Sequence, residues 1–213
     1  AAAANTIDDV NARYGVRPDD VALQVSALDF DLSVYDLFGL LAVGGTVVTL
    51  TEDVRREAAV WAGLAAEHGV TVWNTVPTLL DMLLVACESG TSLPSLRVAI
   101  VSGDWVGLDL PDRLRASAPN ALLVAMGGAT EASIWSNAHD VTVVDPAWVS
   151  IPYGRPLANQ RFRVVDAHGR DRPDFVPGEL WIGGAGVALG YRGDPDRTAA
   201  SFVAAGGERW YRT

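Results

Sequence analysis

Five short apolar segments that have the character of β-strands alternate along the first 126 residues with segments of helical pattern. The expected strands cover residues 21–26, 46–50, 70–73, 96–101 and 121–126. The expected helices cover residues 5–16, 34–43, 54–67, a segment from Pro77 onward, and 108–117. Such alternation with short connections is typical of a mostly parallel sheet covered by helices on both faces. The sequence therefore predicts an α/β fold, whose first helix has Asn5 or Thr6 as its cap and ends at Gly15.

The pattern changes near residue 150. Beyond Ile151 the chain has short strand-like segments joined by tight turns, and helical periodicity returns only at residues 196–204. The expected strands and turns there lie at residues 154–156, 161–170 and 178–183. We therefore predict an α/β unit at residues 1–150, followed by an antiparallel, barrel-like β unit at residues 151–213. The absence of an initial Met and the amphipathic last residues lead us to expect a fragment of a longer chain.

Composition excludes several classes of function. The net charge of −10 and the absence of a basic cluster argue against nucleic-acid binding. No apolar run reaches the roughly 18 residues that a membrane span needs, and no signal peptide is evident, so we expect a cytoplasmic protein without a membrane partner. The single cysteine, Cys87, lies in an apolar helical pattern and is expected to be a buried, unreactive thiol.

Polar or glycine-rich segments follow three of the predicted strands. They are residues 26–31, 102–104 and 127–131. Ligands of open parallel sheets bind beyond the carboxyl ends of the strands, so these segments are expected to converge on one crevice. In the last of them, paired glycines precede the Thr130 hydroxyl and the Glu131 carboxylate, an oxygen ligand that suits Mg2+. The segment predicts a binding site for a nucleotide and its metal ion, and the alternative is a plain turn with a surface glutamate.

Asp31 lies inside the apolar run Phe30–Leu32. A carboxylate there is costly unless a cation pairs with it, and the α-ammonium group of an amino acid is such a cation. The alternative is that Asp31 or Ser33 caps the following helix. The glycine-rich stretch 183–186 invites a phosphate-loop interpretation, but it lacks the Lys-Ser/Thr tail and is expected to serve turn geometry.

Four stretches in order carry a family resemblance. They are Phe30-Asp-Leu-Ser-Val-Tyr-Asp-Leu-Phe38, Gly127-Gly-Ala-Thr-Glu131, Gly178-Glu-Leu-Trp-Ile-Gly-Gly-Ala-Gly-Val-Ala-Leu-Gly-Tyr191 and Trp210-Tyr-Arg-Thr213. Together they resemble the adenylation domains of nonribosomal peptide synthetases, which belong to the adenylate-forming superfamily with acyl-CoA ligases and luciferases. The resemblance implies an ATP-dependent ligase that converts an amino acid into aminoacyl-AMP and pyrophosphate. It also implies later transfer to the phosphopantetheine thiol of a carrier-protein domain.

The resemblance assigns roles to individual residues. Thr130 and Glu131 would be catalytic, and Glu131 would bind the Mg2+ that accompanies ATP. The implied ATP-binding residues are Gly103, Asp104, Gly127, Gly128, Ala129 and Thr130. The implied amino-acid pocket consists of Asp31, Leu32, Tyr35, Asn74, Ile100, Ser102, Met126, Ile134 and Trp135. Gly127 replaces the family's adenine-stacking aromatic residue and Ala129 its proline, departures that also occur in synthetases that build thiazoline and oxazoline rings.

The implied pocket favours a small, weakly polar side chain. Tyr35, Met126 and Trp135 are bulky, while Asn74 and Ser102 are polar without charge. The set resembles the pocket of cysteine-activating domains of thiazoline-forming synthetases, so L-cysteine is the expected substrate and serine, threonine, alanine or a methylated relative remain open. An MbtH-like activator protein is a possible partner.

Two other functions remain open at this point. One is an acyl- or aryl-CoA ligase, and the other is a degenerate, non-catalytic adenylation domain. The family's phosphate loop, ribose-binding Asp and catalytic Lys fall outside these residues, so the chain alone is expected to be inactive.

Overall fold

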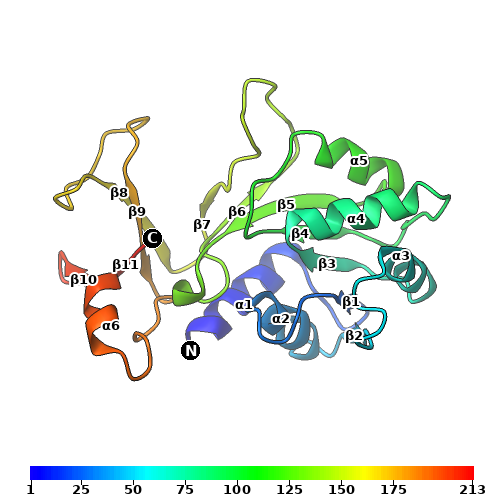
Figure 1. Cartoon of the computed structure of the whole chain (residues 1–213), viewed down its shortest axis with the longest axis horizontal. Coiled ribbons are helices and arrows are strands. Elements are labelled where there is room, and N and C mark those ends of the chain that lie inside the picture. Colours follow the sequence, from blue (N-terminus) through cyan, green and yellow to red (C-terminus); the bar gives the residue numbers. More distant parts are fainter.

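The computed structural model describes residues 1–213 and contains two β-sheets. Sheet A has seven strands in the order β2-β1-β3-β4-β5-β6-β7, and sheet B has four in the order β10-β11-β9-β8. Figure 1 shows sheet A with helices α1 to α5 in one part of the molecule, and sheet B with α6 in the other. This arrangement confirms the predicted α/β sheet followed by an antiparallel β unit.

The five predicted strands form the parallel core of sheet A. They are β1 (Val21–Gln24), β2 (Thr46–Thr49), β3 (Val72–Thr75), β4 (Val98–Val101) and β5 (Leu122–Gly127). Two further strands, β6 (Asn137–Asp140) and β7 (Arg155–Pro156), extend the sheet in antiparallel orientation beyond β5. Carboxyl ends of β1, β3, β4 and β5 therefore lie along one edge of the sheet, which positions the site described below.

Helices cover both faces of sheet A. They are α1 (Ala2–Tyr14), α2 (Leu32–Val34) with the π-helix η1 (Tyr35–Gly39), α3 (Ala58–Glu67), α4 (Pro77–Cys87) and α5 (Leu110–Ser117). Because successive strand residues point to opposite faces, Trp73 lies in the core beneath α3, α4 and α5, while Val72 lies in the core beneath α1 and η1. Trp61 and Cys87 belong to the first core, and burial raises the pKa of the Cys87 thiol, as expected of an unreactive cysteine.

Several predicted helix ends are corrected by the structure. Helix α1 begins at Ala2 rather than at a cap at Asn5 or Thr6, since Thr6 is buried and the Asn5 side chain donates to the Ala158 carbonyl. Its end at Gly15, in the left-handed conformation, is confirmed. The helix expected from residue 54 begins at Ala58, the one expected from residue 108 begins at Leu110, and the one expected at 34–43 begins at Leu32 with a π-turn inside it.

Sheet B consists of β8 (Gln160–Val165), β9 (Glu179–Gly184), β10 (Phe202–Ala205) and β11 (Glu208–Arg212). All of its pairings are antiparallel. Helix α6 (Pro195–Ser201) precedes β10, so the helix expected at 196–204 ends earlier, where Phe202 enters the sheet. Arg155–Pro156, expected in the β unit, pairs instead with β6 of sheet A, so the change of sheet falls between Pro156 and Gln160.

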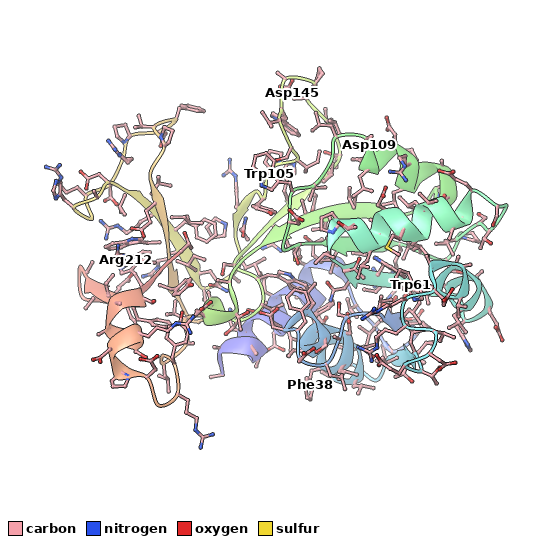
Figure 2. All side chains as sticks on the ribbon, viewed as in Figure 1. Phe38, Trp61, Trp105, Asp109, Asp145 and Arg212 are labelled. Carbon is pink, nitrogen blue, oxygen red and sulfur yellow. The ribbon has the colours of Figure 1, made fainter.

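Sheet B has a small core of its own. Trp181 and Trp210 are buried in it, and the guanidinium of Arg163 lies 5.5 and 5.4 Å from their ring centroids. Figure 2 shows Arg212 in this part of the molecule, apart from Trp61 of α3 in the sheet A part. None of the helices has both the length and the apolar character required to cross a bilayer.

Candidate adenylation site

A cavity of about 140 Å3 lies at the carboxyl edge of sheet A. It is lined by residues from all three of the polar or glycine-rich segments that follow β1, β4 and β5, which confirms that these segments converge. The lining residues are Phe30, Asp31, Leu32, Ser102, Gly103, Gly128, Ala129, Thr130, Ile134 and Trp135. The cavity is therefore the best candidate for a binding site built by the sheet.

Asp31 faces the loop that follows β5. Its Oδ2 accepts a hydrogen bond of 2.7 Å from the Thr130 hydroxyl, although the two residues are 99 positions apart in the sequence. Asp31 occupies the N-cap position of α2 but makes no capping hydrogen bond with its side chain. The capping interpretation of Asp31 is therefore wrong for this structure, and its carboxylate is turned toward the cavity.

One wall of the cavity is formed by Trp135, which the buried Tyr35 supports from behind. The indole Nε1 of Trp135 donates to Ser102 Oγ at 2.8 Å, and the ring meets Tyr35 edge to face at a centroid distance of 5.0 Å. The Tyr35 hydroxyl donates to Asn11 Oδ1 at 3.0 Å, away from the cavity. A Cβ on Gly39 would lie 2.8 Å from the Tyr35 ring, so only glycine fits there. The wall is fixed by its own contacts, as a pocket that selects by shape requires.

Four of the predicted pocket residues lie behind this wall. Tyr35, Asn74, Ile100 and Met126 are buried, at 0%, 2%, 0% and 0% exposure, and none lines the cavity. The Asn74 amide donates to the Leu32 carbonyl at 3.1 Å and to Asp36 Oδ1 at 2.7 Å. These residues support the cavity from beneath, while Asp31, Leu32, Ser102, Ile134 and Trp135 form its surface.

Asp36 is a buried carboxyl group that sequence reasoning missed. It is 1% exposed, its Oδ2 has no hydrogen-bond partner, and burial raises its pKa to about 8. A carboxylate between Tyr35 and Leu37 on a buried helical turn was the available sequence signal. Asp36 accepts a hydrogen bond from the same Asn74 amide that donates to the Leu32 carbonyl, so it helps to fix Leu32 in the cavity lining.

The backbone after Glu131 is strained where it enters the cavity. Ser133 and Ile134 have φ of 64° and 72°, and a β-branched residue seldom adopts this left-handed region. The conformation is held by three contacts: Ser133 Oγ donates to the Gly186 carbonyl at 2.7 Å, Gln160 Nε2 donates to the Trp135 carbonyl at 3.0 Å, and Ser136 N donates to the Gly127 carbonyl. Strain of this kind concentrates at functional sites and places the Ile134 side chain in the cavity wall.

Glu131 is held by the glycine-rich stretch that ends at Tyr191. The Tyr191 hydroxyl donates to Glu131 Oε1 at 2.5 Å, and Ala188 N donates to the Glu131 carbonyl at 2.8 Å. A Cβ on Gly186 would lie 2.5 Å from the Gln160 side chain, so this glycine serves close packing, in agreement with its interpretation as structural. The stretch therefore braces the loop that carries Thr130 and Glu131.

The donor set around Glu131 is compatible with Mg2+ carried by a nucleotide. No three His, Cys, Asp or Glu side chains gather at one place in the chain. Mg2+ is commonly bound by one or two carboxylates together with substrate phosphates and water, so one carboxylate can suffice when ATP supplies the rest. The Glu131 carboxylate, which accepts a hydrogen bond from Tyr191 at Oε1, would be the protein ligand to the ion.

Gly103 and Gly128 line the cavity, and neither position accepts a side chain without strain. Gly103 has φ of 83°, and a Cβ on Gly128 would lie 2.7 Å from the Ile134 carbonyl oxygen. Tyr153, which sequence reasoning missed, donates its hydroxyl to the Asp104 carbonyl at 2.8 Å. Of the predicted ATP-binding residues, Gly103, Gly128, Ala129 and Thr130 line the cavity, while Asp104 and Gly127 lie next to Tyr153.

The fold and this site define the class of protein. Over 100% of its length the chain superimposes on 23% of the solved nonribosomal peptide synthetase FmoA3, with a TM-score of 0.96 and 49% sequence identity. It is also similar, with a TM-score of 0.86 and 28% identity, to the Vibrio cholerae adenylation domain AlmE in complex with glycyl-adenosine-5'-phosphate, covering 98% of this chain and 40% of that one. The architecture is that of an adenylation domain of nonribosomal peptide synthetases.

The sequence places the chain in a defined family. The sequence model described as AMP-binding enzyme matches residues 1–192, and the chain belongs to this family. It is 54% identical over 214 residues to pyochelin synthetase PchE of Pseudomonas aeruginosa, covering 100% of this chain and 15% of that protein. The chain thus spans less than a fifth of the length of this relative.

Proposed function

We propose that the chain forms the amino-acid pocket and part of the ATP site of an adenylation domain that activates an amino acid as its adenylate. The observation that carries the proposal is the 2.7 Å hydrogen bond between Asp31 and Thr130 at the mouth of the cavity. It brings the expected partner of an α-ammonium group next to the expected partner of the ATP phosphates. A site that joins the carboxyl group of an amino acid to ATP requires this proximity.

The proposed reaction has two steps. In the first, a carboxylate oxygen of the amino acid forms a bond to the α-phosphorus of ATP, and the bond from that phosphorus to the β-phosphate oxygen breaks to release pyrophosphate. Thr130 is expected to bind phosphate oxygens, while Mg2+ held by Glu131 would neutralise their charge. In the second step, a thiolate attacks the acyl carbon, a thioester forms, and AMP leaves.

The cavity supports a small substrate side chain. Its volume of about 140 Å3 is bounded by the apolar Leu32, Ile134 and Trp135, and Ser102 is an uncharged polar residue of its lining. One solved form of FmoA3, 49% identical to this chain, is described as bound to α-methyl-L-serine-AMP, which has a small polar side chain. L-Cysteine is our proposed substrate because a thiol combines small size with weak polarity, and serine is the next candidate.

Partners and location follow from the same proposal. The thiol of the second step belongs to a phosphopantetheine group on a carrier-protein domain. An MbtH-like activator is a further proposed partner, and the cytoplasm is the proposed location because ATP and free amino acids meet there. Nothing in the charge pattern supports a nucleic-acid partner, since the net charge is −10.

Two alternatives are distinguished by experiment. An acyl-CoA ligase has no use for a carboxylate at Asp31, and a degenerate domain would not exchange pyrophosphate at all. The test is amino-acid-dependent exchange of labelled pyrophosphate into ATP by an adenylation domain that contains this chain, with a panel of the twenty amino acids and several aryl acids. We expect L-cysteine to give the highest rate. Strong preference for an aromatic or large aliphatic substrate would overturn the pocket assignment, and exchange with aryl acids alone would favour the ligase.

A further inference from the structure

The ring of Tyr153 occupies the space where a side chain at position 127 would begin. A Cβ added to Gly127 would lie 3.0 Å from Tyr153 Cγ, 3.1 Å from Cδ2 and 2.9 Å from Asn137 Oδ1. A larger side chain at position 127 and the observed ring at position 153 therefore exclude each other. Gly127, which departs from the family pattern, is therefore paired with Tyr153, an aromatic residue from the segment just before β7.

The position of Tyr153 is set by hydrogen bonds at its main chain and at its hydroxyl group. Asn137 Nδ2 donates to the Tyr153 carbonyl at 2.9 Å, and the Tyr153 hydroxyl donates to the Asp104 carbonyl at 2.8 Å. The next residue, Gly154, has φ of 86°, and a Cβ there would lie 2.0 Å from the Ala138 carbonyl oxygen. The loop is therefore locked against β6, and the ring bridges the strand end at Gly127 and the loop at Asp104.

The ring also remains accessible. Tyr153 is 38% exposed, although its hydroxyl and its main chain are both engaged. A partly exposed aromatic ring whose hydroxyl and main chain are fixed by hydrogen bonds is preorganised for stacking, because little conformational freedom is lost when a base binds. Gly103 and Gly128, which line the cavity, directly adjoin Asp104 and Gly127, the two residues that the Tyr153 side chain meets.

We propose that Tyr153 supplies the aromatic surface on which the adenine ring of ATP stacks, in place of the side chain that Gly127 lacks. This assignment rests on the proposed function, since it concerns the nucleotide of that same reaction. Stacking of a base on an aromatic side chain changes affinity by about five- to 150-fold. Glycine at position 127 then does not abolish adenine binding, because Tyr153 provides the stacking surface instead.

Trp105 is the competing aromatic residue. It follows Asp104 directly, it is 69% exposed, and Figure 2 shows it in the sheet A part. Its backbone N–H donates to the Asp104 side chain at 2.7 Å, but no hydrogen bond fixes its ring. Tyr153 is favoured because it touches Gly127 and Asp104 together, and Trp105 serves as the matched control.

The test measures binding without turnover. Dissociation constants for ATP and for inorganic tripolyphosphate are determined by calorimetry, in the absence of amino acid, on an adenylation domain that contains this chain. Tyr153→Ala should weaken ATP binding about ten- to 100-fold and leave tripolyphosphate binding unchanged, since only ATP has a base to stack. Tyr153→Phe, which keeps the ring, and Trp105→Ala should each stay within about threefold of the wild type.

A residue swap separates stacking from a structural role. Gly127→Tyr alone should lose ATP binding because the new side chain meets the Tyr153 ring, whereas Gly127→Tyr combined with Tyr153→Val should restore it. Where Tyr153→Ala fails to fold, Tyr153→Leu fills the volume without an aromatic face and should show the same selective loss. Retention of ATP affinity by both Tyr153→Ala and Tyr153→Leu would overturn the assignment, as would equal losses for ATP and tripolyphosphate. A wild-type protein that binds no ATP would instead refute the proposed function.

Discussion

The substitution Asp36→Asn tests whether the buried carboxyl group beneath the cavity carries a proton in the folded chain. Burial raises the pKa of Asp36 from 3.8 to about 8, while the hydrogen bond from Asn74 acts in the opposite direction and is weaker. A raised carboxyl pKa means that the folded chain holds a proton that the unfolded chain releases above pH 3.8. The free energy of unfolding should therefore fall as the pH rises from about 4 to about 8, and stay level beyond that window.

The magnitude follows from the same values. Between the unfolded pKa of 3.8 and neutral pH lie about three pH units, each about 1.4 kcal/mol, so Asp36 should lower stability by about 4 kcal/mol at pH 7 relative to pH 4. Asparagine has no proton to gain, and its Oδ1 can still accept from Asn74. Asp36→Asn should thus resemble the wild type at pH 4 and become more stable than the wild type by up to about 4 kcal/mol at pH 7.

Urea unfolding of the chain, followed by tryptophan fluorescence at several pH values, measures this difference. Other titrating groups are common to both proteins, so their contributions cancel when the two curves are subtracted. Asp29→Asn removes an exposed carboxylate from the segment just before α2 and is the matched control, which should follow the wild type. The reasoning is refuted if Asp36→Asn and the wild type lose stability in parallel between pH 4 and pH 8.

Three further substitutions test the site and the fold. Asp31→Ala should lower amino-acid-dependent exchange on the order of 100-fold or more, because it removes the partner of a buried ammonium group; near-normal exchange with reduced thermal stability would point to a structural role instead. Glu131→Gln should raise the Mg2+ concentration for half-maximal exchange with little effect on the KM for the amino acid, and the reverse pattern would remove Glu131 from the metal site. Gly154→Ala should lower the free energy of unfolding by more than about 2 kcal/mol, since its Cβ would lie 2.0 Å from the Ala138 carbonyl oxygen. Gly193→Ala, at a position with φ of 77° and open space around it, should lower it by only about 1 kcal/mol. Equal melting temperatures for the two variants would contradict this expectation.

The parallel core and the convergence of the site could be predicted from local patterns. Each strand carries its own apolar signal, and the rule for the carboxyl ends of parallel strands then brings Asp31, Ser102 and Thr130 together. Arg155–Pro156 shows the limit of this reasoning. A strand of two residues has no periodicity, and only its pairing with Asn137 and Ala138 reveals that it belongs to sheet A.

The residues that sequence reasoning missed depend on contacts between distant segments. Tyr153 meets Asp104 across 49 positions, and Tyr191 meets Glu131 across 60. Asp36 falls in a segment that its neighbours predict to be an apolar helix, and only the π-turn and the packing against Asn74 show that its carboxyl group is buried. No local pattern in the sequence predicts such contacts. The combination of Gly127 with Tyr153 can nevertheless be sought in the sequences of similar chains.

The most direct test of the central claim compares L-cysteine with 3-mercaptopropionate, which has the same thiol and carboxyl groups but no α-ammonium group. Pyrophosphate exchange is measured with each acid at equal concentration, on an adenylation domain that contains residues 1–213. If Asp31 pairs with the ammonium group in the cavity, L-cysteine should support exchange at least about 100-fold faster than 3-mercaptopropionate. Equal exchange with the two acids would contradict the account, because it would show that Asp31 does not recognise the α-ammonium group.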